Sequence, residues 1–507
     1  MPLESEQRST RPVDLFSDQS IPPLVGDLDR IDLLLESPGS AKAGHAPFVS
    51  VPQRPVRVLG TLSVAAITFF YGCGGPLGSE DVVRIGGPLG GLLALCLYPV
   101  FFTIPYAFVI AELSSAFPED GGFTIWVLNA FGPFWGFQIG YWSWVAGVFG
   151  AAIYPGYLLQ LLKNYFDSQG TTTTLDAVLK IAIGVVLSLP MFGSTRWIGG
   201  ASLLLLALVF LPLLVYVMWC YAAFDDASDL SIVRRVNGTT TADWQTPVLP
   251  RDGPRHGIED SLYTLVNSVF WNYDGIQMAS VFGGQVANPA RVYSRAIWIT
   301  VALTVAAYTL PIPATIVSKS ARWTQFTRGV YVDAAAAVGG SGLRGVMILS
   351  TICTNVGLFM SSLFCKSFEV AGMADNRLLP SCFAVRNRSF GSPHNSLLAT
   401  MTLTLALTVV GVETLLPVTN TFAALVTLMI FISEIRLRLS LPYIPRPTRV
   451  PGGLLGVTVL SVAPIAVCGY ILAMNVTAGA REALMIGLFL VPGLVYGACR
   501  SWLRPEC

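Results

Sequence analysis

Long uncharged and largely apolar stretches follow one another along the chain from residue 58 to residue 499. A helix needs about 20 apolar residues to cross the hydrocarbon core of a bilayer, so these stretches predict membrane spans. Divided at the ionisable residues, they give twelve candidates, of which the fourth and the twelfth are short. They are Val58–Ser79, Ile85–Ala111, Phe123–Leu162, Ile181–Thr195, Trp197–Phe224, Ser261–Ala290, Ile297–Ser318, Gly345–Cys365, Ser389–Val412, Thr414–Ser433, Val450–Ala480 and Ala483–Cys499. The strands of a β-barrel are short and alternate in polarity, so we predict an all-α integral membrane protein with twelve transmembrane helices.

The composition agrees with a membrane protein, since 53% of the 507 residues are hydrophobic and only 12% are charged. A soluble domain carries about 25% charged residues, so a soluble enzyme is excluded. The net charge of +1 leaves no basic surplus that would attract nucleic acid. The nine cysteines show no CxxC spacing, and none of the three histidines lies in the middle of an apolar stretch, so no metal site is predicted. P-loop and HExxH motifs are missing, and we predict a protein that is not an enzyme and has no cofactor.

Two polar segments frame this organisation. Residues 1–55 lack the apolar core of a signal peptide, so we predict a disordered cytosolic tail in front of a membrane domain at 56–504. Most Lys and Arg fall on the inner side if both termini are cytosolic. With that orientation, segment 225–260 is a long extracellular loop, in which Asn237 begins a glycosylation sequence.

The first and sixth spans are interrupted midway. The first contains Gly74, Gly75 and Pro76, and the sixth contains the sequence WNYDG at 271–275. Relative to Ala in a helix, Gly is unfavourable by about 1 kcal/mol and Pro by about 3 kcal/mol. Irregular backbone at membrane depth persists where it lines a cavity or is buried in protein, although a simple packing kink is the alternative. Paired interruptions five spans apart indicate an inverted-repeat transporter with its site at the breaks.

Asp274 is the candidate with the clearest physical argument. It stands in the middle of the sixth span, where an aspartate is unfavourable by about 3 kcal/mol. That free energy is explained if a positive charge binds beside it, or if it takes up and releases a proton. The alternative is a buried carboxylate that only hydrogen-bonds the broken helix.

The remaining candidates surround the two breaks. Glu80 follows the first break and would attract cations from outside. Trp271 and Tyr273 flank Asn272 beside the second break, where their ring faces could hold an ammonium by cation–π attraction. Tyr154 ends a face of small residues on the third span, where a ligand could approach. Each of these side chains could instead serve packing or a helix end.

A series of short motifs, densest in the first third of the chain, carries a family resemblance. They are GGPLGSED at 74–81, GPL at 87–89, IP at 104–105, AEL at 111–113, FPEDGG at 117–122, FGPFWGFQ at 131–138, YP at 154–155, FWN at 270–272, GQVANP at 284–289, GMA at 372–374 and LP at 379–380. Across residues 56–500 the chain resembles the polyamine uptake transporters of plants and trypanosomatid parasites. These belong to the amino acid–polyamine–organocation superfamily.

The resemblance implies a LeuT-like fold of five plus five inverted spans followed by two more. It implies a substrate site between the breaks of spans one and six, at Gly74, Gly75, Pro76 and at 271–275. It also implies uptake of putrescine, spermidine or related cations by alternating access in symport with protons, Na⁺ being less favoured. The expected partners are the amine and the bilayer of the plasma membrane, with no nucleic acid and no obligate protein partner.

Some acidic positions of the plant relatives differ in this chain. Gly150 and Ala151 replace an Asp-Asn pair in the third span, Ile276 and Gln277 replace a Trp-Asp pair in the sixth, and a Glu is missing near Ser362. An amino acid permease of the same fold therefore stays open as an alternative. A nutrient sensor that binds without transport is the alternative from another class.

Overall fold

The computed structural model describes residues 57–166, 172–225, 227–231, 258–410, 412–477 and 479–503. The predicted tail 1–55, Asn237 and most of the predicted loop 225–260 lie outside these residues. Within the described ranges the chain is helical, and strand-like pairing is limited to two isolated bridges. The all-α prediction is therefore confirmed for this part of the chain.

Seven α-helices form the first half of the described chain. The elements are α2 (Thr61–Gly72), α3 (Ser79–Tyr98), η1 (Pro99–Thr103), α4 (Ile104–Ala116), α5 (Phe123–Phe131), α6 (Pro133–Phe166), α7 (Thr173–Ser188), η2 (Leu189–Phe192), α8 (Thr195–Ala222) and η3 (Ser228–Ser231). The turn η1 is a π-helix, whereas η2 and η3 are 3₁₀-helices.

Eight α-helices form the second half. The elements are α9 (Ile258–Tyr273), η4 (Ile276–Ser280), η5 (Gly283–Gln285), α10 (Pro289–Thr309), α11 (Pro311–Val317), η6 (Trp323–Gln325), α12 (Val330–Asp375), η7 (Ser381–Ala384), α13 (His394–Leu407), α14 (Val412–Ser440), α15 (Gly453–Thr477) and α16 (Ala480–Leu503). The turns labelled η in this half are 3₁₀-helices.

Nine helical segments within the described ranges are long and apolar enough to cross a membrane. Three of the twelve predicted spans correspond to shorter helices: α2 has 12 residues, α9 has 16 and α13 has 14. The first two are short because the helix stops at the predicted interruption, at Gly72 in α2 and at Tyr273 in α9.

Two predicted spans have different bounds in the structure. The predicted third span is divided by Gly132, whose φ of +86° ends α5 before α6 begins. The fourth span begins at Thr173, earlier than predicted, because charged residues belong to the helix. One of them, Asp176, pairs with Lys163 of α6 at 2.6 Å.

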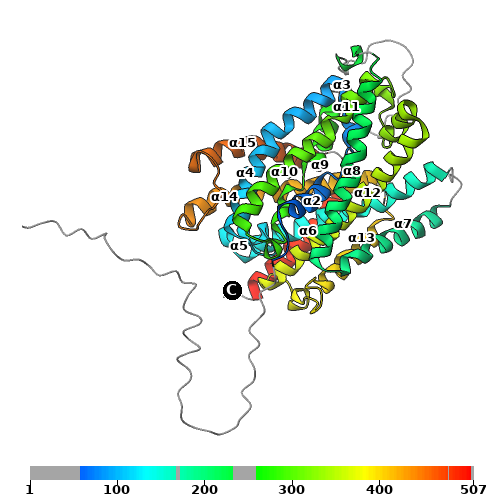
Figure 1. Ribbon diagram of the computed structural model, residues 1–507. Coiled ribbons are helices and arrows are strands. Elements are labelled where there is room, and N and C mark those ends of the chain that lie inside the picture. The colour runs from blue at the N-terminus through cyan, green and yellow to red at the C-terminus, as the bar shows by residue number, and fades with distance from the viewer. Residues whose placement is uncertain are drawn as a thin grey trace, which may run out of the picture. The chain divides into compact units, whose positions relative to one another are not determined.

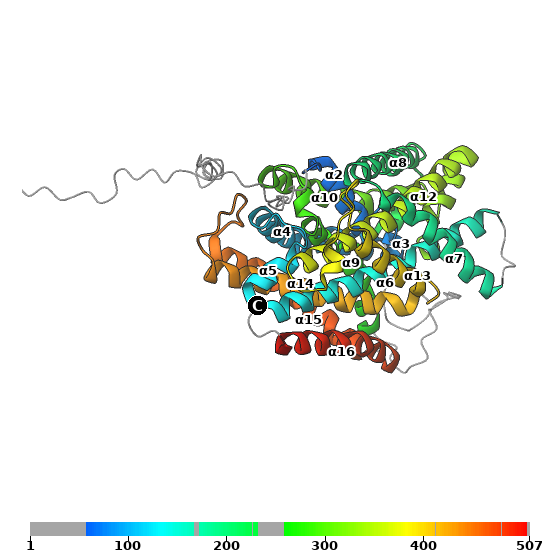
Figure 2. The same cartoon turned by 90° about the horizontal axis from the view of Figure 1, so that it is seen from below.

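Helix α2 lies in the middle of the bundle, packed against α8, α10 and α12 (Figure 1). Helix α16 lies along the edge of the bundle beside α15 (Figure 2). Large apolar side chains on the outer helices are exposed, among them Met218, Leu455 and Leu484. Exposed apolar surface of this kind is suited to lipid.

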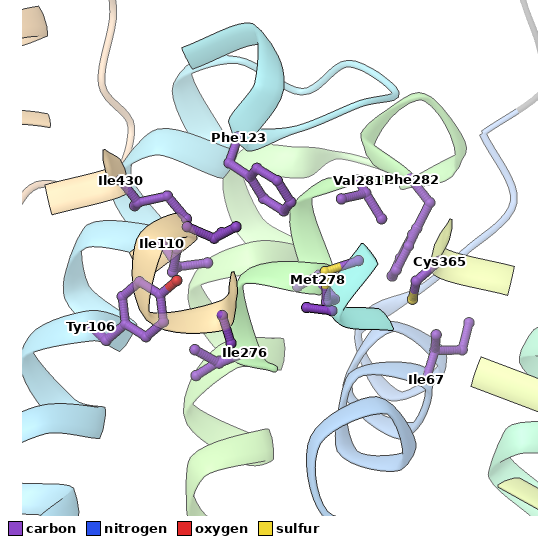
Figure 3. Packing of buried hydrophobic residues seen from close by; sticks show 14 of the residues in the cluster. Ile67, Tyr106, Ile110, Phe123, Ile276, Met278, Val281, Phe282, Cys365 and Ile430 are labelled. Atoms are coloured by element: carbon purple, nitrogen blue, oxygen red, sulfur yellow. The ribbon is translucent and has the colours of Figure 1, made fainter. Parts of the chain in front are cut away.

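A buried apolar cluster surrounds the turn η4. In Figure 3, Ile276 and Met278 of this turn lie among side chains from α2, α4 and α12, including Ile67, Tyr106 and Cys365. The core of the bundle is thus packed directly against the chain that follows α9.

Candidate functional site

The chain between α2 and α3, residues 73–78, forms the first break. Three of its glycines have positive φ values, +68° at Gly74, +150° at Gly75 and +101° at Gly78. L-residues with side chains rarely adopt these conformations, so the glycines allow the helix to end here. The N–H groups of Cys73 and Gly74 both donate to Phe69 O, at 2.8 and 3.0 Å, and close the last turn of α2. The predicted interruption of the first span is therefore present.

Helix α12 covers the first break. The Thr354 hydroxyl donates to Gly74 O at 2.9 Å. A Cβ atom placed on Gly75 would lie 2.9 Å from Thr354 Oγ1. Backbone of the first break is therefore held by the helix that crosses it, with little space between them.

Asp274 and Gly275 form the second break. Gly275 has a φ of +119°, and its N–H donates to Gln277 Oε1 at 3.1 Å. The sequence predicted a single span, Ser261–Ala290, with one interruption. In the structure no α-helix follows the break until α10 begins at Pro289. Instead the chain continues through the 3₁₀ turns η4 and η5.

The two breaks are in direct contact. Asn272 Nδ2 donates to Gly78 O at 3.2 Å. A Cβ atom on Gly72 would lie 2.6 Å from Asp274 O, and one on Gly275 would lie 2.8 Å from Gly72 Cα. The backbones of α2 and α9 can approach this closely because neither glycine carries a side chain.

Asp274 is partly buried at the second break. Its N–H donates to Phe270 O at 2.9 Å, which closes α9, and its Oδ1 accepts from Gln277 Nε2 at 3.0 Å. The ion pairs formed among the described residues involve other carboxylates. The negative charge of Asp274 is thus hydrogen-bonded but has no cation within ion-pair distance in the described chain.

A small cavity lies beside Asp274, with room for about one water molecule. Hydroxyl groups from three elements line it: Thr68 of α2, Thr103 of η1, and Thr300 and Thr304 of α10. Thr103 Oγ1 is buried and has no hydrogen-bond partner among the described residues. The site can therefore offer a carboxylate and hydroxyls to a polar group, but it must open to admit an amine.

Glu80 is buried in the first turn of α3, with 2% of its surface exposed. Its Oε2 accepts from Gly78 N at 2.7 Å, so the carboxylate is directed at the first break. The neighbouring Asp81 instead forms ion pairs with Arg84 at 2.9 Å and Arg328 at 3.4 Å. Only the first of the two acidic residues therefore borders the break.

The predicted aromatic residues have different surroundings. Trp271 lies against Gly78, where a Cβ atom would be 3.1 Å from Trp271 Cζ3. Tyr273 lines the small cavity, and its hydroxyl donates to Leu95 O at 2.7 Å. Tyr154 is buried on α6 next to Ser362 of α12. Pro76 accepts from the Ser79 hydroxyl through its carbonyl at 2.7 Å, which closes the first break.

Sequence reasoning missed a charged pair inside a span. The predicted eighth span, Gly345–Cys365, ended just before Lys366 and left both charged residues outside it. Helix α12 instead continues to Asp375, and Lys366 and Glu369 are 1% and 0% exposed. Their three-residue separation within an apolar segment was the signal that could have found them, because it places both on one helix face.

Glu112 joins several elements at the end of α4. It is fully buried and accepts from Arg438, from Arg446 at 2.8 Å and from Val450 N at 2.6 Å. Arg438 also pairs with Glu434 at 2.7 Å. The network connects α4 with α14 and with the segment before α15.

A second polar cluster lies at the segment between α4 and α5. Asp120 pairs with Arg386 at 2.8 Å and accepts from Gly284 N at 2.9 Å. Arg386 also pairs with Asp375 at 2.7 Å. Burial raises the pKa of Asp120, and the Arg386 guanidinium opposes that change. The cluster connects the chain after the second break to the end of α12.

The chain is similar in sequence to known membrane transporters. It is 29% identical over 451 residues to the polyamine transporter PUT1 of Oryza sativa subsp. japonica, covering 88% of this chain and 80% of that protein. It is 28% identical over 459 residues to the polyamine transporter RMV1 of Arabidopsis thaliana, covering 89% of each. The arginine/agmatine antiporter of Chlamydia trachomatis serovar L2 is 22% identical over 351 residues, covering 66% of this chain and 68% of that protein.

The family match covers most of the chain. Residues 59–492 match the amino acid permease family, and this range contains both breaks, Asp274 and the α12 pair. The chain therefore belongs to the amino acid permease family of the amino acid–polyamine–organocation superfamily.

Proposed function

We propose that this chain is a secondary active transporter that imports polyamines by alternating access. The observation that carries the proposal is Asp274, a carboxylate at the contact of two helix breaks with no cation in ion-pair distance among the described residues. A substrate ammonium would supply that cation. The names of the two plant relatives support polyamines as the substrate class.

The architecture belongs to the proposal as well. Twelve spans arranged as a LeuT-like five-plus-five inverted repeat would consist of the nine long segments together with α2, α9 and α13. The contact between the breaks of α2 and α9 supports this arrangement, since inverted-repeat transporters bind substrate where two interrupted helices meet.

Each site residue then has a role. Asp274 pairs with one ammonium, and Glu80 attracts the second. Backbone groups at Gly74, Gly75 and Pro76 bind polar atoms of the substrate, and Asn272 holds the two breaks together through Gly78.

The aromatic rings enclose the alkyl chain. Trp271 and Tyr154 contribute ring faces, and Tyr273 contributes its ring only, because its hydroxyl is engaged with Leu95.

Coupling and location complete the proposal. We place the protein in the plasma membrane with both termini cytosolic, and we take protons rather than Na⁺ as the driving ion. Asp274 beside the small cavity supports proton movement, because a carboxylate can take up and release a proton.

Uptake of labelled putrescine into proteoliposomes, with and without an inward proton gradient, tests the proposal. The variant Asp274→Asn should reduce uptake by about 100-fold or more, because a buried ammonium loses its counter-charge. The exposed residue Asp333 on α12 offers a matched control, and Asp333→Asn should retain uptake. Unchanged uptake in Asp274→Asn would remove this residue from the mechanism.

Competition separates the alternatives. Spermidine should compete with putrescine more strongly than arginine or lysine does. The reverse order would favour a basic amino acid permease, and binding without counterflow would favour a nutrient sensor.

A further inference from the structure

The pair Lys366–Glu369 on α12 is buried in the interior of the bundle. The ammonium of Lys366 donates to Glu369 Oε2 at 2.7 Å and to Ser143 Oγ of α6 at 2.5 Å. Both side chains are almost completely excluded from solvent. The second carboxylate oxygen of Glu369 has no hydrogen-bond partner among the described residues.

The surroundings of Lys366 are shaped for a long side chain. A Cβ atom on Gly147 of α6 would lie 2.0 Å from Lys366 Cε, so the glycine provides the space that the lysine fills. The Nζ atom also lies 3.5 Å from Met278 Sδ of η4 and 5.5 Å from the ring centre of Tyr71 of α2. The ammonium thus borders α2, α6 and the turn that follows the second break.

The same region includes Asp274. Tyr71 of α2 links the two. A Cβ atom on Gly275, the residue after Asp274, would lie 2.8 Å from Tyr71 Cδ1, and the centre of the same ring is 5.5 Å from Lys366 Nζ. The contact region of the breaks therefore contains two carboxylates and one resident ammonium.

Stability alone does not explain this pair. Removing two charges from water is costly, and apolar residues of similar volume often stabilise a buried position as well as an ion pair or better. A pair that only filled space between α6 and α12 would not need charges. The two charges also determine the net charge of the region around a bound cation, which apolar side chains would not do.

We infer that Lys366 determines the site's preference among amines that carry different numbers of positive charges. Its ammonium neutralises Glu369, so that Asp274 is the carboxylate of this region left for a substrate ammonium. Without Lys366, two carboxylates would face the substrate, and amines of higher charge would be favoured. This inference rests on the proposed transport of amines.

Three variants test the charge balance. Lys366→Met keeps an unbranched side chain of similar length and leaves Glu369 without its counter-charge. Glu369→Gln keeps a hydrogen-bond acceptor for Nζ and leaves Lys366 without its counter-charge. The double variant Lys366→Met/Glu369→Gln has the wild-type net charge and serves as the matched control. The readout is competition of labelled putrescine uptake by butylamine, putrescine and spermidine, which carry one, two and three ammonium groups.

Lys366→Met should shift the ratio of affinities toward the more highly charged amines by about tenfold. Glu369→Gln should shift the ratio by a similar factor in the opposite direction, and the double variant should return it to the wild-type value. An equal loss for all three amines in both single variants, or an unchanged ratio, would overturn the inference.

Folding and the proposed function are checked separately. If Lys366→Met is not recovered as a folded protein, Glu369→Gln and the double variant still test the inference. Only a charge effect would shift the ratio of affinities in Glu369→Gln and restore the wild-type ratio in the double variant. A wild-type protein that takes up none of the amines would contradict the proposed function itself.

Discussion

At the scale of single residues, the first break depends on glycines that no other residue replaces at the same backbone geometry. Gly75 combines a φ of +150° with a close approach to Thr354. Gly60, at the start of α2, has open space around it and an ordinary backbone. The two glycines therefore separate conformational strain from a general effect of adding a methyl group.

We expect Gly75→Ala to weaken amine uptake by about tenfold, because the added Cβ displaces the Thr354 hydroxyl and strains the backbone by about 1–2 kcal/mol. Concentration dependence of putrescine uptake measures the effect. Gly60→Ala should behave as wild type. An unchanged affinity in Gly75→Ala would show that the first break tolerates a side chain and does not shape the site.

Residue chemistry could be predicted where one charge stands out against an apolar background. Asp274 and the break glycines were found in this way, and the structure places the two breaks in contact through Asn272 and Gly78. Lys366 and Glu369 were missed because dividing the chain at ionisable residues ended the predicted eighth span at Cys365. Their burial depends on Gly147 and Ser143 of α6. A contact between two helices that are far apart in the sequence cannot be predicted from the sequence around either one.

At the scale of helices, the elements could be located from the sequence, but the way in which they are joined could not. Stretches free of charge predicted most helices, yet the predicted third span is two helices separated by Gly132. The π-helical turn η1 also escaped prediction, because Pro99 at its start is equally compatible with a kink in a regular helix. That turn places Thr103 at the cavity beside Asp274, and π-helical turns often occur at functional sites.

The connection of α4 with α14 depends on Glu112. We expect Glu112→Gln to lower the free energy of unfolding by about 3 kcal/mol, because Arg438 and Arg446 lose a buried counter-charge. Thermal unfolding in detergent should show a lower midpoint. The exposed neighbour Glu119 is the control, and Glu119→Gln should leave the midpoint unchanged. Equal midpoints for the two variants would mean that the network does not hold α4 to α14.

At the scale of the whole molecule, the site is closed. The cavity beside Asp274 admits about one water molecule, so helices must move before an amine can bind. Cys73 reports on that movement, since it lies in the first break with 3% of its surface exposed and donates to Gly75 O at 3.2 Å.

We expect a membrane-impermeant thiol reagent to label Cys73 slowly in a variant whose other cysteines are replaced by serine. Saturating putrescine should slow the labelling further, because a bound amine fills the first break. Mass spectrometry of the labelled protein measures the rate. Labelling that is rapid and indifferent to putrescine would contradict a closed site at this break.

The bridge between Leu59 and Val286 has a mechanical consequence. Leu59 N donates to Gln285 O, and Ala287 N donates to Leu59 O, each at 2.9 Å, so the chain entering α2 is paired with the chain that follows the second break. These hydrogen bonds hold the two backbone segments together, so that they form one unit. A passage on this side of the protein would widen only if both segments tilted together. A displacement of the chain entering α2 would therefore also displace the chain that follows the second break.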